Sequence, residues 1–445
     1  MDYKEMLNPI TGYTLDKEFA VFSRDFDFTY LPDYEKYDPN SKPIVQDGFV
    51  WVETLTGQRI AIHYPRLAEL NEDKYTSDCD AIIQFDNFSH DTLPDHVNEI
   101  ILYGGSLDYL YDADRPIAIR KDNDILVVSS DGILEYNIPE ESRKQTRKII
   151  IGKHRLTKEA NNFNSYSFEE VYLKFVFLEP VSLSAVSDYY GLAVHLVRFM
   201  TKRFDVSFRS AKVKSTAGRV KYADGTIFVK STIKPCMLFS ETSITFQDLG
   251  WTLINLLSIF TRMVKEKGKW NRDYSLDFIS SNADAGAITN EIICSISGAL
   301  EYEVSRHKDI EELRNREIDI FAKAVRDFIK DNYKSYNVPE KALNLIYGST
   351  QNWSLSAAER FSALEQKYKE AVDHLKTRLF EGKYYNIGEF VKHRNQLMHR
   401  SSNPPTFEIR VTAMILRGLV YCSILGRAGV ELTVISKLCE EGRIE

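Results

Sequence analysis

Apolar and polar positions alternate in short runs along the N-terminal half of the chain. This two-residue period is typical of strands with one buried face. Turn residues separate the runs, which predicts an antiparallel sandwich or barrel-like domain. The runs are GFVWVETL (48–55), QRIAIHY (58–64), AIIQF (81–85), VNEIILY (97–103), IAIR (117–120), ILVVS (125–129), GILEYNI (132–138) and VYLKFVFL (171–178).

Two dipeptides in this half predict hairpin turns, and one segment predicts a helix. Thr56-Gly57 lies between the first two runs, and Asp224-Gly225 lies inside RVKYADGTIFVK (219–230), the clearest hairpin pattern. SLSAVSDYYGLAVHLVRFMTKR (182–203) has apolar residues at helical spacing instead. We expect this one helix to pack on the sheet.

After about residue 245 the apolar period changes to three or four residues, which is typical of amphipathic helices. Ser354 or Ser356 can cap one of these helices, and the prolines of NPP (403–405) stop another. The predicted fold is therefore α+β, with an antiparallel β-rich domain over 1–243 and an all-α helical bundle over 244–445. The predicted helices are 248–266, 282–304, 309–333, 355–378, 386–399, 407–427 and 431–440.

Composition places the chain among soluble globular proteins. Of its 445 residues, 43% are apolar and 27% are charged. Two apolar stretches, 251–264 and 411–430, are each interrupted by arginine, so we expect core helices and no membrane span. The N-terminus lacks the pattern of a secretory signal. We therefore expect a cytoplasmic protein.

The five cysteines are odd in number and widely spaced, and they contain no CxxC pair. This pattern argues against a disulfide framework or a structural zinc site. Neither an HExxH pattern nor a phosphate-binding loop occurs. We expect no metal and no cofactor.

Charge is unevenly distributed between the two halves. Residues 1–244 carry 29 Lys and Arg against 37 Asp and Glu, whereas 245–445 carry 28 against 27. The segment 374–400 is locally basic, with six Lys and Arg, three His and only two Glu. It is the best candidate for contact with an anion such as RNA.

The stretch FVKHRNQLMHR (390–400) carries the candidate chemistry. Arg394, Asn395 and His399 form the pattern R-N-x-x-x-H at the end of a predicted helix. Five helical residues turn the chain by about 500°, so Arg394 and His399 lie roughly 140° apart on one helix. Asn395 and His399 are four residues apart and share a face, so the amide can orient the imidazole.

This motif resembles the active motif of HEPN-domain ribonucleases, and its surroundings are similar to the ApeA-like anti-phage branch of that family. GALEYEVSR (298–306) is similar to the helix that opens the family's bundle, and MILRGLVYCSILGRAGV (414–430) to the apolar helix after the motif. The resemblance implies a helical HEPN bundle that cleaves RNA, with transfer RNA as one substrate of the family. Ser401 stands where some relatives carry a tyrosine, so tyrosine modification of that kind is not expected.

Metal-free RNA cleavage needs one group to remove the 2′-hydroxyl proton, another to protonate the leaving 5′-oxygen, and a cation for the phosphorane. We assign proton transfer to His399 and phosphate binding to Arg394, with Asn395 as the third catalytic residue. Lys392, His393 and Arg400 are second-rank candidates for binding the RNA backbone. One copy supplies one histidine, so we predict a homodimer through the HEPN domain. Nothing in the spacing of Glu301 and His307 requires catalysis, and we interpret both as structural.

Two functions remain open from the sequence. The first is a metal-independent endoribonuclease that forms 2′,3′-cyclic phosphate ends in anti-phage defence. Its N-terminal domain would sense a phage-derived trigger or restrain the nuclease. The alternative is a non-catalytic helical dimerisation module fused to a β-rich binding domain.

Overall fold

The protein is described from a computed structural model, which divides into two compact units. The first consists of Met1–Thr201, Asp205–Ser240 and Thr245–Ile254, and the second of Lys202–Phe204, Glu241–Ile244 and Asn255–Glu445. The residues that the structure describes are 10–14, 19–22, 27–31, 45–46, 49–54, 59–63, 69–70, 74–78, 81–88, 96–111, 127–130, 133–137, 146–160, 164–203, 206–217, 220–229, 243–265, 279, 288–311, 313, 316–335, 339, 355–398 and 403–444.

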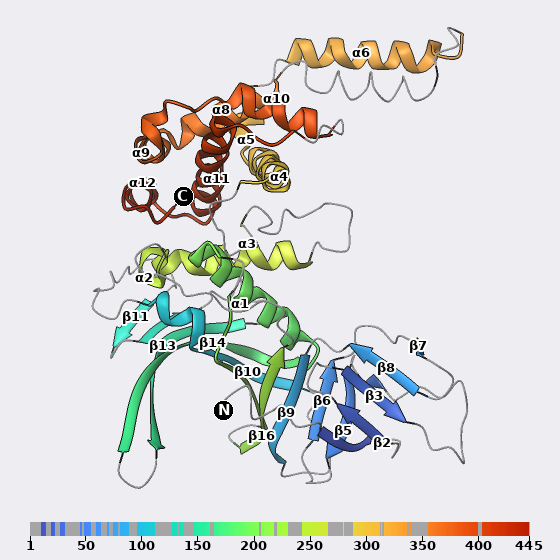
Figure 1. Ribbon diagram of the computed structural model, residues 1–445, viewed down its shortest axis with the longest axis vertical. Helices are drawn as coiled ribbons and strands as arrows, with labels where there is room; N and C mark the ends of the chain where they lie inside the picture. Colours follow the sequence, from blue (N-terminus) through green and yellow to red (C-terminus); the bar gives the residue numbers. More distant parts are fainter. Residues whose placement is uncertain are drawn as a thin grey trace. The chain divides into compact units, whose positions relative to one another are not determined.

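The described strands of the first unit form one antiparallel sheet (Figure 1). It contains sixteen strands in the order β11-β12-β13-β14-β10-β15-β16-β9-β6-β5-β1-β2-β3-β8-β7, with β4 paired to β5. The bounds are β1 Ile10–Thr14, β2 Phe19–Phe22, β3 Asp27–Leu31, β4 Val45–Gln46, β5 Phe49–Thr54, β6 Arg59–His63, β7 Glu69–Leu70, β8 Lys74–Asp78, β9 Ala81–Phe88, β10 His96–Tyr103, β11 Val127–Ser130, β12 Ile133–Asn137, β13 Thr146–Ala160, β14 Asn164–Ser182, β15 Ser210–Ala217 and β16 Val220–Val229. The predicted strand at 117–120 lies outside the described residues.

Helix α1 (Ala185–Thr201) packs on one face of the sheet over β10 and β14. Leu173, Phe175 and Phe177 alternate along β14 and are at most 6% exposed. The ring of Tyr189 in α1 lies 5.3 Å from that of Phe175 and 4.7 Å from that of Phe177. The predicted helix on the sheet is confirmed. Because every second residue of β14 points to the same side, its apolar residues form the surface on which α1 packs.

The predicted hairpin turn at Asp224-Gly225 is wrong. These residues lie within β16, which pairs with β15 on one side and β9 on the other. The pairing with β9 shifts register between Asp224 and Gly225, so the dipeptide marks a β-bulge. A Cβ at Gly225 would lie 2.9 Å from methyl carbons of Ile83 and Val213. The glycine therefore permits close packing inside the sheet, and the hairpin joins β15 to β16.

The C-terminal half is helical, so the α+β class is confirmed. A short 3₁₀ segment, η3 (Gly105–Tyr109), follows β10 in the first unit. The remaining helical elements are α2 Phe246–Leu249, η6 Gly250–Thr252, α3 Leu253–Lys265, α4 Asn290–Arg306, α5 Lys308–Glu311, α6 Arg316–Asn332, α8 Ala357–Lys367, α9 Lys369–Arg378, η8 Phe380–Gly382, α10 Ile387–Met398, α11 Phe407–Arg427 and α12 Leu432–Glu440.

Helix α11 is the core of the second unit, and it contacts α4, α8, α9, α10 and α12. Among the described residues it is the one helix long and apolar enough to cross a membrane by length and composition. However, 78% of its most apolar window is buried inside the protein. Its hydropathy is thus explained by packing against neighbouring helices.

Four predicted helices differ from the structure. The predicted helix 248–266 is divided into α2, η6 and α3, and Gly250 directly after α2 has a φ of 50°. Thr289 caps α4 by accepting a hydrogen bond from the Ile292 N–H, so this helix begins at Asn290 and not at 282. The segment 309–333 divides into α5, in which Ile310 is buried, and α6, and the exposed Leu313 lies between the two helices.

The helix predicted over 355–378 breaks at Tyr368, which separates α8 from α9. The backbone there has φ −111° and ψ 30°, and the side chain is 3% exposed. A Cβ at Gly426 would overlap the Tyr368 hydroxyl, so the ring fits directly against the backbone of α11. Ser356, rather than Ser354, caps α8 in a capping box with Glu359.

Candidate active site around Arg394

Helix α10 carries the motif and is fixed by its apolar side. The Asn386 side chain caps its start by accepting a hydrogen bond from the Glu389 N–H at 3.1 Å. Ile387, Phe390 and His393 follow at three-residue steps and are at most 8% exposed. This spacing places the three on one face, which packs in the bundle with α4, α8 and α11.

Arg394 lies at the edge of this packed face and forms an ion pair with α4. Its Nη2 donates to Glu301 Oε1 at 2.8 Å, and its Nη1 donates to the neighbouring Asn395 Oδ1 at 3.2 Å. The Arg394 side chain is 24% exposed and that of Glu301 is 35% exposed. The guanidinium is therefore oriented from two sides and still accessible to solvent.

Glu301, which the sequence led us to interpret as structural, lies against the motif arginine. It lies 93 positions before Arg394, and no local spacing links the two. The ion pair has two consequences for the site. It fixes the direction of the guanidinium, and it offsets part of the positive charge that would attract a phosphate.

Asn290, at the start of α4, connects both sides of the segment that contains His399. Its Nδ2 donates to the Asn403 carbonyl at 3.1 Å, and its Oδ1 lies 3.1 Å from His393 Nε2. Because the amide oxygen is an acceptor, the His393 Nε2 carries the proton in this contact. Asn290 thus holds the end of α10 and the chain before α11 against α4.

His393 is buried, and this position does not suit the predicted contact with RNA. Its side chain is 6% exposed and hydrogen-bonded to Asn290. Burial lowers the pKa of its imidazole, which favours the neutral form. A buried neutral imidazole packs α10 on α4 and supplies no charge for a phosphate.

The other predicted site residues divide between exposed and undescribed positions. Lys392 and Asn395 are exposed on α10, and Lys392 forms a loose ion pair with Glu389 at 3.5 Å. His399 and Arg400 lie outside the described residues. The structure therefore describes the motif through Arg394, Asn395 and the residues of α4 that lie near them.

Cys294 is half-buried on the same face of α4 as Glu301, seven residues earlier. Burial raises the pKa of its thiol, while the nearby Arg394 charge acts in the opposite direction. The thiol form is therefore favoured, and Cys294 does not have the character of a nucleophile.

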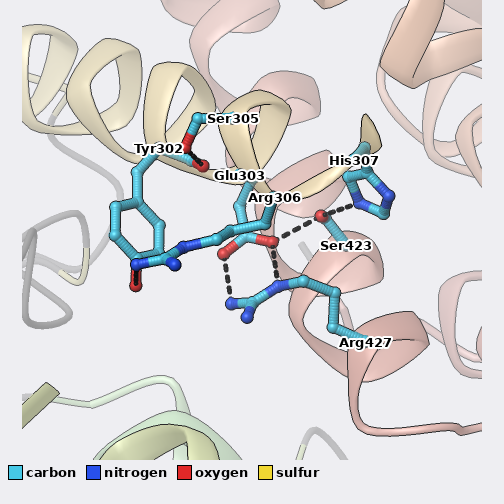
Figure 2. A network of polar contacts seen from close by, with 7 residues as sticks. All are labelled: Tyr302, Glu303, Ser305, Arg306, His307, Ser423 and Arg427. Carbon is cyan, nitrogen blue, oxygen red and sulfur yellow. Dashed lines mark hydrogen bonds and ion pairs between the residues drawn. The ribbon is translucent and has the colours of Figure 1, made fainter. Parts of the chain in front are cut away.

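A second polar network lies on the opposite face of α4 (Figure 2). Glu303 is fully buried and accepts two hydrogen bonds from Arg427, at 2.7 Å from Nε and 2.6 Å from Nη2. Ser423 Oγ donates to the same carboxylate at 2.6 Å, and His307 Nε2 lies 2.9 Å from Ser423 Oγ. The network joins α4 to the last turns of α11.

Ser423, His307 and Glu303 are the residue types of a hydrolase triad, but their hydrogen bonds run the wrong way. The Ser423 proton points to Glu303, so His307 Nε2 must donate to Ser423. Lys367 approaches the other ring nitrogen, Nδ1, at 3.2 Å. Burial and then the Lys367 charge lower the pKa of His307. A fully buried serine that donates to a carboxylate is not an activated nucleophile.

Within the described ranges, no group of three or more His, Cys, Asp and Glu side chains is placed to hold a metal ion. When the chain was compared with protein-family models, curated proteins and solved structures, none of them matched. The site must therefore be interpreted from its own geometry and from the motif.

Proposed function

We propose that the protein is a metal-independent endoribonuclease of the HEPN type. One observation carries the proposal. Arg394 is half-buried, is oriented by Glu301, and stands beside the exposed Asn395 within the pattern R-N-x-x-x-H. Among the described residues, Glu301 and Asn395 engage two of the five guanidinium N–H donors, and the other three are the ones proposed to bind phosphate oxygens.

In the proposed reaction, an imidazole removes the proton of a ribose 2′-hydroxyl, and the 2′-oxygen attacks the adjacent phosphorus. Arg394 stabilises the charge on the phosphorane through its planar pair of N–H groups. A second imidazole protonates the leaving 5′-oxygen. The products are a 2′,3′-cyclic phosphate and a 5′-hydroxyl, and no metal ion takes part.

Two imidazoles require two copies of the motif, because His399 is the one motif histidine with this role. We therefore propose a homodimer through the helical unit, in which His399 of each chain contributes one proton transfer. Lys392 is retained as a contact for the RNA backbone, and Arg400 keeps its predicted role. His393 is not included, because it is buried.

The biological setting follows from the resemblance to the ApeA-like branch. We propose that RNA cleavage acts in anti-phage defence in the cytoplasm, with transfer RNA as a substrate to examine first. The β-rich unit would then sense a phage-derived trigger or restrain the nuclease. This part of the proposal rests on the motif and on the division of the chain into a sheet unit and a helical unit.

The test is RNA cleavage by the purified full chain in the presence of EDTA. We expect cleavage to persist in the chelator and to leave 2′,3′-cyclic phosphate ends. His399→Ala should abolish it, and Arg394→Ala should lower it strongly. Cleavage that continues in His399→Ala would exclude the proposed mechanism.

One observation favours the alternative, a non-catalytic dimerisation module. The carboxylate of Glu301 offsets the charge of Arg394, as it would in an ion pair that only stabilises the bundle. The two functions differ in the behaviour of Arg394→Ala. Loss of a dimer, measured by light scattering, supports the module, whereas loss of activity in an intact dimer supports the enzyme.

A further inference from the structure

A pocket of about 220 Å³ lies at the start of α10, away from Arg394. Its lining includes Tyr384, Glu389, Glu408 and Thr412, which come from the start of α10, the start of α11 and the segment before α10. Eight residues separate Asn386 from Arg394, which is about 12 Å along a helix. The pocket is therefore distinct from the candidate active site, although both involve α10.

Three aromatic rings form an exposed cluster beside this pocket. Phe380, Tyr384 and Phe407 contact one another edge to face, with ring centroids 5.1 to 6.0 Å apart. Phe380 is 52% exposed and Phe407 is 50% exposed. Mutual packing of this kind fixes the rings and leaves their outer faces open to solvent.

The backbone that presents Phe380 adopts an unfavourable conformation. Phe380, Glu381 and Gly382 all have positive φ, at 59°, 55° and 67°. A bulky aromatic residue in this region is rare, because its Cβ crowds the backbone. Such outliers occur mostly where a function or the surrounding structure requires them.

The segment that follows is held rigidly. The Thr412 hydroxyl donates to the Tyr384 carbonyl at 3.2 Å and accepts from the Asn386 N–H at 3.0 Å. The Tyr385 hydroxyl donates to Glu365 at 2.8 Å. These contacts fix the pocket wall before any ligand arrives, which lowers the entropy cost of binding.

The charges of the pocket favour a cation. Two carboxylates, Glu389 and Glu408, line it together with one cation, Lys383, and all three side chains are exposed. Lys392 forms a loose ion pair with Glu389 at 3.5 Å, which offsets part of the charge of that carboxylate. The pKa of Glu408 is lowered by its own backbone N–H and by the Thr406 hydroxyl, so this carboxylate stays ionised. Glu381 adds a third exposed carboxylate next to Phe380.

RNA fits this surface less well than a cation does. Exposed aromatic rings can stack on bases, but RNA also brings phosphates close to the protein. The exposed carboxylates of Glu381 and Glu408 would repel those phosphates. Aromatic faces beside carboxylates are instead the arrangement that binds ammonium and guanidinium groups.

We propose that this pocket binds an arginine or lysine side chain of a partner polypeptide. The charged group would lie between Glu389 and Glu408, and its methylene stem would pack on Phe407 and Phe380. This proposal does not depend on RNA cleavage. It adds a partner site on the same helix that carries the motif.

The test uses Nα-acetyl-arginine amide as the probe and saturation-transfer NMR with the full chain as the measurement. Nα-acetyl-citrulline amide is the matched neutral control, and uridine monophosphate is the anionic one. At about 10 mM we expect transfer to the arginine side chain, with a signal at least threefold stronger than for citrulline. Glu408→Gln and Phe407→Ala should each weaken the arginine signal by a similar factor.

Circular dichroism of both variants establishes that the helices are intact. Three results would overturn the proposal: no transfer to arginine, equal transfer to arginine and citrulline, or an arginine signal unchanged in both folded variants. Transfer to uridine monophosphate that is lost in Phe407→Ala would assign the surface to nucleic acid instead. RNA cleavage is a separate readout, so a failure of arginine binding leaves the proposed nuclease untouched.

Discussion

Helix α4 carries two glutamates, two residues apart, that each pair with an arginine from another helix, and the two pairs differ in almost every other respect. Glu303 is fully buried, and it forms a bidentate pair with the 17%-exposed Arg427 and accepts a hydrogen bond from Ser423. Glu301 and Arg394 share one hydrogen bond at the edge of the bundle, where both are partly exposed. Two residues turn a helix by about 200°, so the pairs lie on opposite faces.

The difference shows how the same residue types take on separate tasks. The buried Glu303 carboxylate accepts its hydrogen bonds from Arg427 and Ser423 within the protein. No group of this pair therefore remains to act on a substrate. In the edge pair the guanidinium is accessible to solvent, and within the described part of the chain two of its five N–H donors are engaged. We therefore interpret the first pair as the structural connection between α4 and α11, and the second as part of a site.

We expect the largest effect on stability from breaking the ion pair between Glu303 and Arg427. Arg427→Ala leaves the Glu303 carboxylate buried without its cation, which should lower the free energy of unfolding by about 3–5 kcal/mol. Arg394→Ala is the matched control, and it should cost less than about 1 kcal/mol because the edge pair is partly exposed. Urea unfolding of the full chain, followed by circular dichroism, measures both. Equal losses would contradict the assignment of separate roles.

For RNA cleavage we expect Arg394→Ala to have a larger effect than Arg427→Ala, the reverse of their order for stability. Arg394→Ala should lower RNA cleavage by about 10²–10³-fold, the usual consequence of removing a group that stabilises transition-state charge. Arg394→Lys keeps the charge but loses the planar fork, so it should retain an intermediate rate. Initial rates on a labelled RNA in EDTA measure these changes. A rate unaffected by Arg394→Ala in a folded dimer would support the non-catalytic module.

The two buried histidines, His307 and His393, should make the free energy of unfolding depend on pH. The pKa values of His307 and His393 are lowered by burial, so the folded state disfavours their protonation. Below the unfolded value of about 6.5, the unfolded chain binds more protons, and stability falls as the pH decreases until the folded-state pKa is reached. Above pH 6.5 this contribution is complete.

His307→Gln separates the contribution of this histidine from that of other groups. The slope of unfolding free energy between pH 6.5 and 5 should decrease, by at most about 1.4 kcal/mol per pH unit for one histidine. Thermal unfolding across this range, with wild type as reference, measures it. A steeper slope in the variant would mean that folding raises the pKa of His307 instead of lowering it.

The smallest effect on stability is expected from Glu301→Gln, which removes the edge carboxylate but keeps its shape. Unfolding free energy should change by less than about 1 kcal/mol. Turnover should nevertheless fall, by about tenfold, because the guanidinium loses the partner that orients it. RNA affinity should not weaken, since a negative charge has been removed. Steady-state kinetics separate the two quantities, and unchanged turnover would make Glu301 a purely structural partner.

The sequence predicted the helices whose apolar stripes face the core. The predicted helix 407–427 agrees with α11 at both ends, and 386–399 differs from α10 by one residue at each end. Helix α11 has strong local signals in the cap at Thr406 and the prolines before it, and Asn386 caps the start of α10. The Asp224-Gly225 turn was wrong because the packing around Gly225 outweighed a local turn preference.

The sequence predicted only those residues of the candidate site that lie close together along the chain. Arg394, Asn395 and His399 stand out because their spacing is short and chemically meaningful. Glu301 and Asn290 reach the motif from about a hundred residues earlier, and only the packing of α4 on α10 brings them there. His393 has the same residue type as His399 but lies on the buried face of α10. A charge count along the chain does not distinguish buried from exposed cations.

The most direct test of the central claim is the cleavage of RNA by the full chain in EDTA, with His399→Ala and Arg427→Ala measured alongside wild type. We predict 2′,3′-cyclic phosphate ends from wild type and none from a fully folded His399→Ala. In Arg427→Ala, cleavage should fall only in proportion to the unfolded fraction. Cyclic phosphate ends from folded His399→Ala at the wild-type rate would contradict the proposed mechanism.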